Sequence, residues 1–313
     1  MKYSHVLGYV ASQLWAIDPA KLQELLAVLA FRAAGHTFTA EEIQARVGGG
    51  PGSRGASSNG NVAIVPVRGV IAHRMGAMDD SSGGTSCERI GAMLREVMAD
   101  ASVSTVVLDI DSPGGTVTGC QELAADLFAL RGQGKRITAM VNGMAASAAY
   151  WLASQADEIV CIPSGTTGSI GVFCAHEDVS AALEKEGVKI SLMSAGTYNV
   201  AGNPTEPLSD EERAVIQARV DEAYGWFVQD VARGRGVTAS AVRKGYGEGR
   251  ALSAKDAKAA GLIDRIATFD ETIGRLVGRK AGGGMRAELP EDDITDAAAP
   301  ALAAAMGRRA WLL

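Results

Sequence analysis

A single serine stands among small residues in segment 143–151, whose sequence is GMAASAAYW. The apolar run 137–141 predicts a strand that ends just before this segment, and Asn142-Gly143 is a dipeptide typical of tight turns. A strand, a turn and a helix in this order would place Ser147 at the edge of a sheet. There the positive end of the helix dipole favours a nearby oxyanion. Ser147 is therefore a candidate nucleophile, although a serine in an alanine-rich helix also serves as simple packing.

A second segment, 108–115, has the sequence LDIDSPGG. A strand that ends in Ser-Pro-Gly-Gly exposes backbone N–H groups on residues without side chains, so a substrate carbonyl can approach them closely. Gly114 and Gly115 are thus candidates for an oxyanion hole. The alternative is a plain turn, which Pro-Gly and Gly-Gly also form.

A third segment, 166–172, has the sequence TTGSIGV and places Ser169 between two glycines just after an expected strand. This pattern is also compatible with a turn that happens to contain a serine. Taken alone, each of the three segments has an ordinary structural explanation.

Composition limits the function classes. The 313 residues include 30 basic and 36 acidic side chains, for a net charge of −6, which argues against a nucleic-acid-binding surface. The four cysteines are widely spaced and have no neighbouring histidine cluster, so we expect no metal, no cofactor and a reduced, cytoplasmic setting. No run reaches the roughly 18 apolar residues of a membrane span. We expect a protein without a membrane span or an export signal.

The chain divides into four expected parts. Residues 1–47 form a helical module, in which Asp18-Pro19 precedes one apolar helical stripe and a second short helix follows from Thr39. Residues 48–61, rich in glycine and serine, form a linker. Residues 62–280 form the main domain, and the alanine-rich, acidic tail 281–313 is expected to be mobile.

Short apolar runs alternate with helical periods in the main domain, which predicts an α/β fold. Strands are expected at 62–67, 105–110, 137–141, 158–162 and 188–193. Later helices begin after Ser209, Thr238 and Ser253. The helix after Ser209 carries apolar residues over a wide angle, which suggests a second contact surface.

The order of these motifs is more specific than any one of them. The segments SPGG, GMAASAAYWLAS, ADEIV, TGSIGV and GRALSAKDAKAAGLID together resemble the signal peptide peptidase A family of Ser/Lys serine peptidases, over residues 61–276. The resemblance implies a Clp/crotonase-type fold of stacked ββα units, in ring-shaped homo-oligomers.

The N-terminal part, with Leu14-Trp15-Ala16-Ile17 before its helices, is similar to the phage head-maturation, or protein C, branch of this family. That branch implies an endopeptidase that cleaves scaffold and capsid proteins inside the procapsid, in the cytoplasm of the host cell. It also suggests that the tail begins a scaffold segment, with Met285 as a possible internal start.

The resemblance assigns Ser147 as the nucleophile, Gly114 and Gly115 as the oxyanion loop, and Ser169 as the residue that supports the base. The family base is a lysine in a G-x-Y-K segment, which must lose its proton to act. Here Asn199 stands at that position in GTYN. An amide cannot remove the serine proton.

Lys189 and His176 are the nearest alternative bases, although we expect Lys189 at a solvated strand end and His176 in a loop. Three functions remain open: a serine peptidase, a non-catalytic structural or scaffold component of the same fold, and a crotonase-type acyl-CoA enzyme. The last would also use paired N–H groups as an oxyanion hole, but it gives no reason for GMAAS or TGSIG.

Overall fold

A mainly parallel sheet forms the centre of the protein. The computed structural model describes residues 10, 12–33, 56–74 and 84–277. The central path of this sheet runs β11-β10-β8-β6-β3-β2, and β9 joins it by pairing with β8 and with β12. Its strands are β2 (Ser57–Asn59), β3 (Val62–Arg68), β6 (Thr105–Ser112), β8 (Arg136–Ala146), β9 (Glu158–Cys161), β10 (Thr166–Gly168), β11 (Ala251–Ser253) and β12 (Arg265–Ile266).

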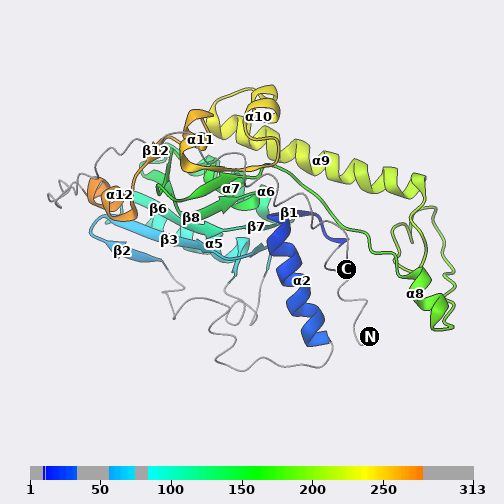
Figure 1. Ribbon diagram of the computed structural model, residues 1–313. Helices are drawn as coiled ribbons and strands as arrows, with labels where there is room; N and C mark the ends of the chain where they lie inside the picture. The colour runs from blue at the N-terminus through cyan, green and yellow to red at the C-terminus, as the bar shows by residue number, and fades with distance from the viewer. Residues whose placement is uncertain (1–9, 11, 34–55, 75–83, 278–313) are drawn as a thin grey trace, which may run out of the picture. The chain divides into compact units, whose positions relative to one another are not determined.

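Strands β3, β6 and β8 are parallel neighbours rich in buried aliphatic residues, as expected for strands covered on both faces. Helices α5 (Cys87–Ala99) and α6 (Cys120–Leu130) connect these strands in sequence. The expected α/β alternation is confirmed, and four of the five predicted strands are present (Figure 1).

A second, smaller sheet lies beside the ends of the central strands. Its order is β1-β7-β4-β5, formed by β1 (Trp15–Ile17), β7 (Gly114–Thr116), β4 (Ile71–Ala72) and β5 (Thr85–Ser86). Strand β7 follows β6 after a single residue, Pro113, so the SPGG segment carries the chain from one sheet to the other. Strand β1 pairs antiparallel with β7, and the sequence did not predict it.

The N-terminal helix begins where its capping residues predict. Helix α2 spans Pro19–Ala33, and the carboxylate of Asp18 accepts hydrogen bonds from the N–H groups of Ala20 (3.0 Å) and Lys21 (3.3 Å). Strand β2 lies within the range 48–61 that the composition suggested as a linker. The second predicted N-terminal helix and the tail 281–313 lie outside the described residues.

The predicted turn at Asn142-Gly143 is wrong, because β8 continues through both residues to Ala146. The pairing with β6 shifts there: Ile110 pairs with Val141, but Ser112 pairs with Ala145. Gly143 adopts φ 142°, and a Cβ on it would stand 2.4 Å from a carboxylate oxygen of Asp111. The glycine therefore permits a bulge within a strand instead of a turn.

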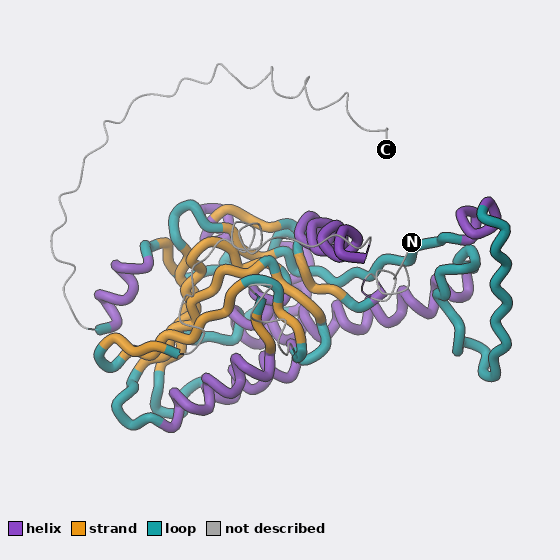
Figure 2. The backbone as a smooth tube through the Cα atoms, turned by 90° about the horizontal axis from the view of Figure 1, so that it is seen from below, coloured by secondary structure: helices purple, strands orange, loops and turns teal. Residues whose placement is uncertain are grey.

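Residues 171–222 form a long stretch without a single buried residue. We call residues 174–222 the arm; it contains α8 (Ser180–Lys185) and the first half of α9 (Asp210–Arg235). Helix α8 lies near the N-terminal end of α9, away from the central sheet (Figures 1 and 2). The predicted strand at 188–193 is wrong, since this segment is an exposed loop of the arm.

The second half of α9 contributes buried residues to the main hydrophobic core around the central sheet. The helices α7 (Ala148–Ala153), α10 (Ala239–Gly245) and α11 (Ala254–Ala259) contribute to the same core. Helix α12 (Phe269–Leu276) packs on the other face of the sheet, where Ile273 joins a smaller apolar cluster with Val107 and Met140. Among the described helices, none is both long enough and apolar enough to cross a membrane.

Candidate active site

Ser147 is the N-cap of α7 and has a strained backbone, with φ 55° and ψ −117°. Positive φ is rare for a residue with a side chain, and such strain concentrates at functional sites. Its N–H group donates to the carbonyl of Gly168 (2.8 Å) and its hydroxyl to the carbonyl of Gly171 (3.3 Å). Only 1% of its surface is exposed. The expected position of Ser147 at the start of a helix is thus confirmed.

Gly114 lies beside Ser147 and has no room for a side chain. It adopts φ 100°, and a Cβ on it would stand 2.9 Å from the carbonyl oxygen of Ala146 and 2.2 Å from that of Ala16. Its N–H group donates to Ser112 Oγ (3.2 Å). The structure therefore brings the first glycine of SPGG next to the candidate nucleophile, as an oxyanion donor would require.

Gly115 has a different environment. A Cβ on this residue would stand 1.7 Å from the carbonyl oxygen of Ile71, because β7 packs directly against β4 at this point. The absence of a side chain at Gly115 therefore permits close packing of the smaller sheet.

Ser169 joins Ser147 through β10. Gly168, the last residue of β10, pairs with Ala146 at the end of β8, so the two serines follow paired positions on adjacent parallel strands. Ser169 is also strained, with φ 53°, and its N–H group donates to the carbonyl of Arg250 (2.9 Å). The TGSIG segment is thus a strand followed by a strained serine at the candidate site.

Asn199 is not brought to Ser147 within this chain. It lies in the exposed part of the arm between α8 and α9, which is separate from α7 in Figure 1, and its side chain donates to Ser194 Oγ (3.3 Å). Lys189 is exposed in the same segment. His176 is also in the arm, where its Nε2 lies 3.2 Å from the carbonyl oxygen of Asn203.

Buried polar contacts hold α7 in place. The indole N–H of Trp151 donates to Asp230 on α9 (2.8 Å), and the Trp151 ring stacks on Phe227 with centroids 4.5 Å apart. The hydroxyl of Tyr150 donates to the carbonyl of Leu262 (2.9 Å), and burial raises the pKa of this phenol. Sequence reasoning missed these positioning residues, because Asp230 is 79 positions from its partner.

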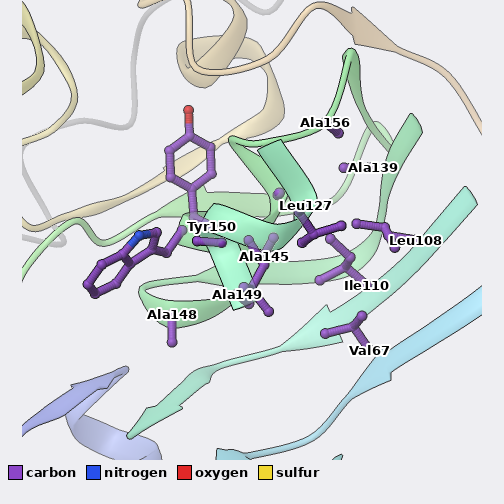
Figure 3. Packing of buried hydrophobic residues seen from close by; sticks show 14 of the residues in the cluster. Val67, Leu108, Ile110, Leu127, Ala139, Ala145, Ala148, Ala149, Tyr150 and Ala156 are labelled. Atoms are coloured by element: carbon purple, nitrogen blue, oxygen red, sulfur yellow. The ribbon is translucent and has the colours of Figure 1, made fainter. Parts of the chain in front are cut away.

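The small residues around the serine allow this helix to enter the core. Ala145, Ala148 and Ala149 are completely buried together with Tyr150 (Figure 3). Larger side chains at these positions would push α7 away from the sheet. The sequence suggested that these alanines could be simple packing residues. Their small side chains allow the end of β8 and the start of α7 to lie close to β7.

Strand β1 lies across this site. Ala16 pairs with Gly115 and Ile17 with Gly114, and on its other side Trp15 exchanges two backbone hydrogen bonds with Phe173, of 2.8 and 3.0 Å. The strand is almost completely buried. Sequence reasoning noted the Leu14–Ile17 segment only through the family resemblance and assigned it no structure.

The arrangement suits acyl transfer. A strained serine stands beside a glycine whose N–H group could bind an oxyanion, and a second serine lies on the adjacent strand. Within the described residues, the hydrogen-bond partner of the Ser147 hydroxyl is the backbone carbonyl of Gly171. A carbonyl cannot remove the serine proton, so this contact does not supply the general base.

Comparison with known proteins agrees with this chemistry. Residues 129–281 match peptidase family S49. The chain is 34% identical over 281 residues to capsid assembly protease C of Escherichia phage lambda, covering 85% of this chain and 63% of that protein. It is 34% identical over 238 residues to the head-tail preconnector protein GP5 of Enterobacteria phage P21, covering 76% and 47%.

A bacterial relative is more distant. Protease 4 of Salmonella typhi is 30% identical over 220 residues, which are 70% of this chain and 35% of that protein. The chain thus spans less than two thirds of the length of each of these three relatives.

Proposed function

Because residues 129–281 belong to peptidase family S49, we propose that the protein is a serine endopeptidase of the phage capsid-maturation type. The observation that carries this proposal is the strained Ser147, held at a helix start beside Gly114 and Ser169. Strain of this kind persists only where surrounding structure enforces it.

In the proposed mechanism, the Ser147 oxygen attacks the scissile carbonyl, the amide C–N bond breaks, and the amine leaves with the proton that the serine loses, which gives an acyl-enzyme. Water then hydrolyses this ester, releases the acyl group as a carboxylic acid and returns a proton to Ser147. The N–H group of Gly114 stabilises the oxyanion, once it exchanges Ser112 Oγ for the substrate oxygen. Ser169 supports the base. Asn199, at the position of the base, can form hydrogen bonds but cannot accept the proton, so the chain as given should cleave slowly.

The proposed substrates are proteins. The names of the two phage relatives refer to capsid assembly and to a head-tail preconnector, which supports scaffold and capsid proteins as substrates. The corresponding site of action is the procapsid, in the cytoplasm of the host cell.

The proposed quaternary structure is a ring of copies, built on a Clp/crotonase-type fold. The two adjoining sheets and their crossover helices support this fold. In the arm, Val188, Ile190 and Leu192 alternate with more polar residues as in a strand, yet these three are 43 to 45% exposed. A strand needs hydrogen-bonding partners along its edges, and a neighbouring copy would supply them.

A second candidate function is a non-catalytic component of the same fold. Asn199 specifically favours it, because the residue in the base position lacks a titratable group. The two candidates differ in one observable property, the reactivity of Ser147.

Labelling with a fluorophosphonate probe tests the peptidase. We expect slow covalent labelling at Ser147, located by mass spectrometry, and slow cleavage of an unstructured protein substrate. Both should disappear in Ser147→Ala and persist in the control Ser164→Ala, which alters an exposed serine. Absence of labelling and of cleavage in the folded protein would favour the non-catalytic component.

A further inference from the structure

Strand β1 fills a position between two segments that both border Ser147. On one side is β7, which contains Gly114, and on the other is Phe173, two residues after the carbonyl that accepts the Ser147 hydroxyl. A Cβ on Gly114 would stand 3.0 Å from the Cα of Ile17. The peptide that joins Ala16 to Ile17 is therefore packed against the candidate oxyanion residue.

The contacts that hold β1 come mainly from its backbone. Besides the two hydrogen bonds between Trp15 and Phe173, the carbonyl of Leu14 accepts from Val117 (3.0 Å) and the N–H group of Asp18 donates to Pro113 (2.8 Å). Addition of an extended segment to a sheet edge uses such bonds whatever the side chains are. Another extended peptide could make the same bonds.

The side chains of β1 divide between two environments. Ala16 is completely buried and belongs to the main core, so the inner side of this position accepts only a small residue. Trp15 and Ile17 belong to a separate small cluster with Leu22 of α2, against which Phe173 packs. The position therefore fits an extended peptide with a small side chain between two large apolar ones.

The direction of β1 matches that of a substrate. Because β1 is antiparallel to β7, the chain runs from Thr116 towards Gly114 and reaches the vicinity of Ser147 with its C-terminal end. A segment on the acyl side of a scissile bond would approach the serine in the same way.

We propose that the β1 position is the binding site for the extended segment of a protein substrate, and that residues 14–18 occupy it as an internal pseudosubstrate. This inference rests on the proposed peptidase function. Because β1 already pairs with β7, a substrate segment can use this edge only after β1 leaves. In the structure with β1 in place, Ser147 is 1% exposed.

The sequence after β1 explains why the segment is not itself cut. Asp18 is followed by Pro19, the first residue of α2, and the Asp18 carboxylate caps this helix. The chain beyond β1 is thus folded away as a helix, and proline cannot form the extended backbone hydrogen bonds of a substrate. Residues 14–18 can bind like a substrate without presenting an extended leaving group.

Release of β1 requires little disruption of the remaining structure. In α2, whose burial is described from Pro19 to Phe31, Leu22 is the sole buried residue. The other attachments are Ala16 in the main core, the small cluster around Trp15, and the backbone bonds to β7 and Phe173. A competing substrate segment would restore those backbone bonds after β1 has left.

Ala16→Arg tests the proposal, because a long charged side chain cannot occupy the fully buried inner side. We expect fluorophosphonate labelling of Ser147 to become about tenfold faster or more, through a shift towards the open state. The matched control Ala27→Arg makes the same change at an exposed position of α2 and should label like the unmodified protein. If circular dichroism shows that Ala16→Arg does not fold, Trp15→Ala provides a second, milder way to weaken the binding of β1.

A fluorescent peptide with the sequence of residues 13–18, QLWAID, gives a readout that is independent of catalysis. Fluorescence anisotropy should show tighter binding to Ala16→Arg than to the unmodified protein or to Ala27→Arg. Equal labelling and equal peptide binding in all folded variants would overturn the pseudosubstrate. If Ser147 is labelled in none of them, the peptidase proposal fails, and peptide binding alone then decides whether the β1 position accepts an extended segment.

Discussion

The indole Nε1 of Trp151 donates a 2.8 Å hydrogen bond to the carboxylate of Asp230, and both side chains are buried. Trp151 lies one turn after Ser147 in α7, and its N–H group donates to the Ser147 carbonyl (2.9 Å). Asp230 lies in the second half of α9 and also pairs with Arg233 (3.0 Å). The orientation of the candidate nucleophile thus depends on a helix that continues into the arm.

Asp230→Leu should destabilise the protein by about 1 to 3 kcal/mol, because the buried indole N–H of Trp151 loses its acceptor. Asp230→Asn keeps an acceptor oxygen and should cost less. Urea unfolding measures this order. Asp221→Leu, at an exposed position of the same helix, is the control, and an equal loss in Asp230→Leu and Asp221→Leu would show that the hydrogen bond contributes nothing.

Local signals predicted much of the fold. The helices after Ser209, Thr238 and Ser253 begin where predicted, because each cap is a hydrogen bond to a residue three positions away. Strand β1 could not be predicted in this way. It has three residues, and its existence depends on β7, which lies about a hundred positions later in the sequence.

At the candidate site, too, local sequence signals predicted some features and missed those that depend on contacts between distant segments. The motifs identified Ser147, Gly114 and Ser169, which lie together because β6, β8 and β10 are adjacent parallel strands. The error at 188–193 arose because alternation of apolar residues predicts a strand, whereas within the described chain this segment has no strand partner. The roles of all these residues remain predictions, including that of Asn199.

Asp264 should make stability depend on pH. Burial alone would raise the pKa of its carboxyl, but hydrogen bonds from Arg235 and from the N–H group of Ile159 outweigh burial and lower it from the ordinary 3.8. A lowered pKa in the folded state stabilises the protein above the unfolded value, and this contribution is lost as the pH falls below about 4. We expect the urea midpoint to fall between pH 5 and pH 3.

Asp264→Asn isolates this effect. The variant should lose about 1 to 3 kcal/mol at pH 7, because the largely buried guanidinium of Arg235 loses its anionic partner. It should also show a smaller change between pH 5 and pH 3 than the unmodified protein. The exposed change Asp126→Asn serves as the control. An unchanged pH dependence in Asp264→Asn would assign the acid sensitivity to other groups.

The arm should contribute to self-association. Ile190→Asp and Leu192→Asp place a charge where a neighbouring copy is expected to bury an apolar side chain. Each should weaken association by about 2 kcal/mol, or roughly 30-fold, as measured by sedimentation velocity. Ser191→Asp, between them, replaces a side chain that is already polar and should have a much smaller effect. Sedimentation of the unmodified protein as a monomer at micromolar concentration would contradict the proposed ring.

Asn199→Lys should convert a slow peptidase into a faster one. A serine hydroxyl near neutral pH is a weak nucleophile until a base takes its proton, and such assistance typically contributes ~10² to 10⁴ in rate. Asn199 lies in the exposed segment between α8 and α9 and bonds to Ser194, and Figure 1 shows this segment apart from α7. We therefore expect the lysine to act on the serine of a neighbouring copy. The gain should therefore increase with protein concentration as copies associate.

The activity of Asn199→Lys should depend on pH. A lysine acts as a base only when it is neutral, so the activity of Asn199→Lys should rise with pH as the amine loses its proton, and burial against the neighbour would shift this rise to lower pH. The assay follows cleavage of an unstructured protein substrate by the unmodified protein, Asn199→Lys, the neighbouring control Thr197→Lys and the double variant Asn199→Lys, Ser147→Ala. Thr197→Lys should leave the slow rate unchanged, and the double variant should be inactive. Full activity in the unmodified protein, abolished by Ser147→Ala and unaffected by Asn199→Lys, would show that another residue is the base and that position 199 does not reach the serine.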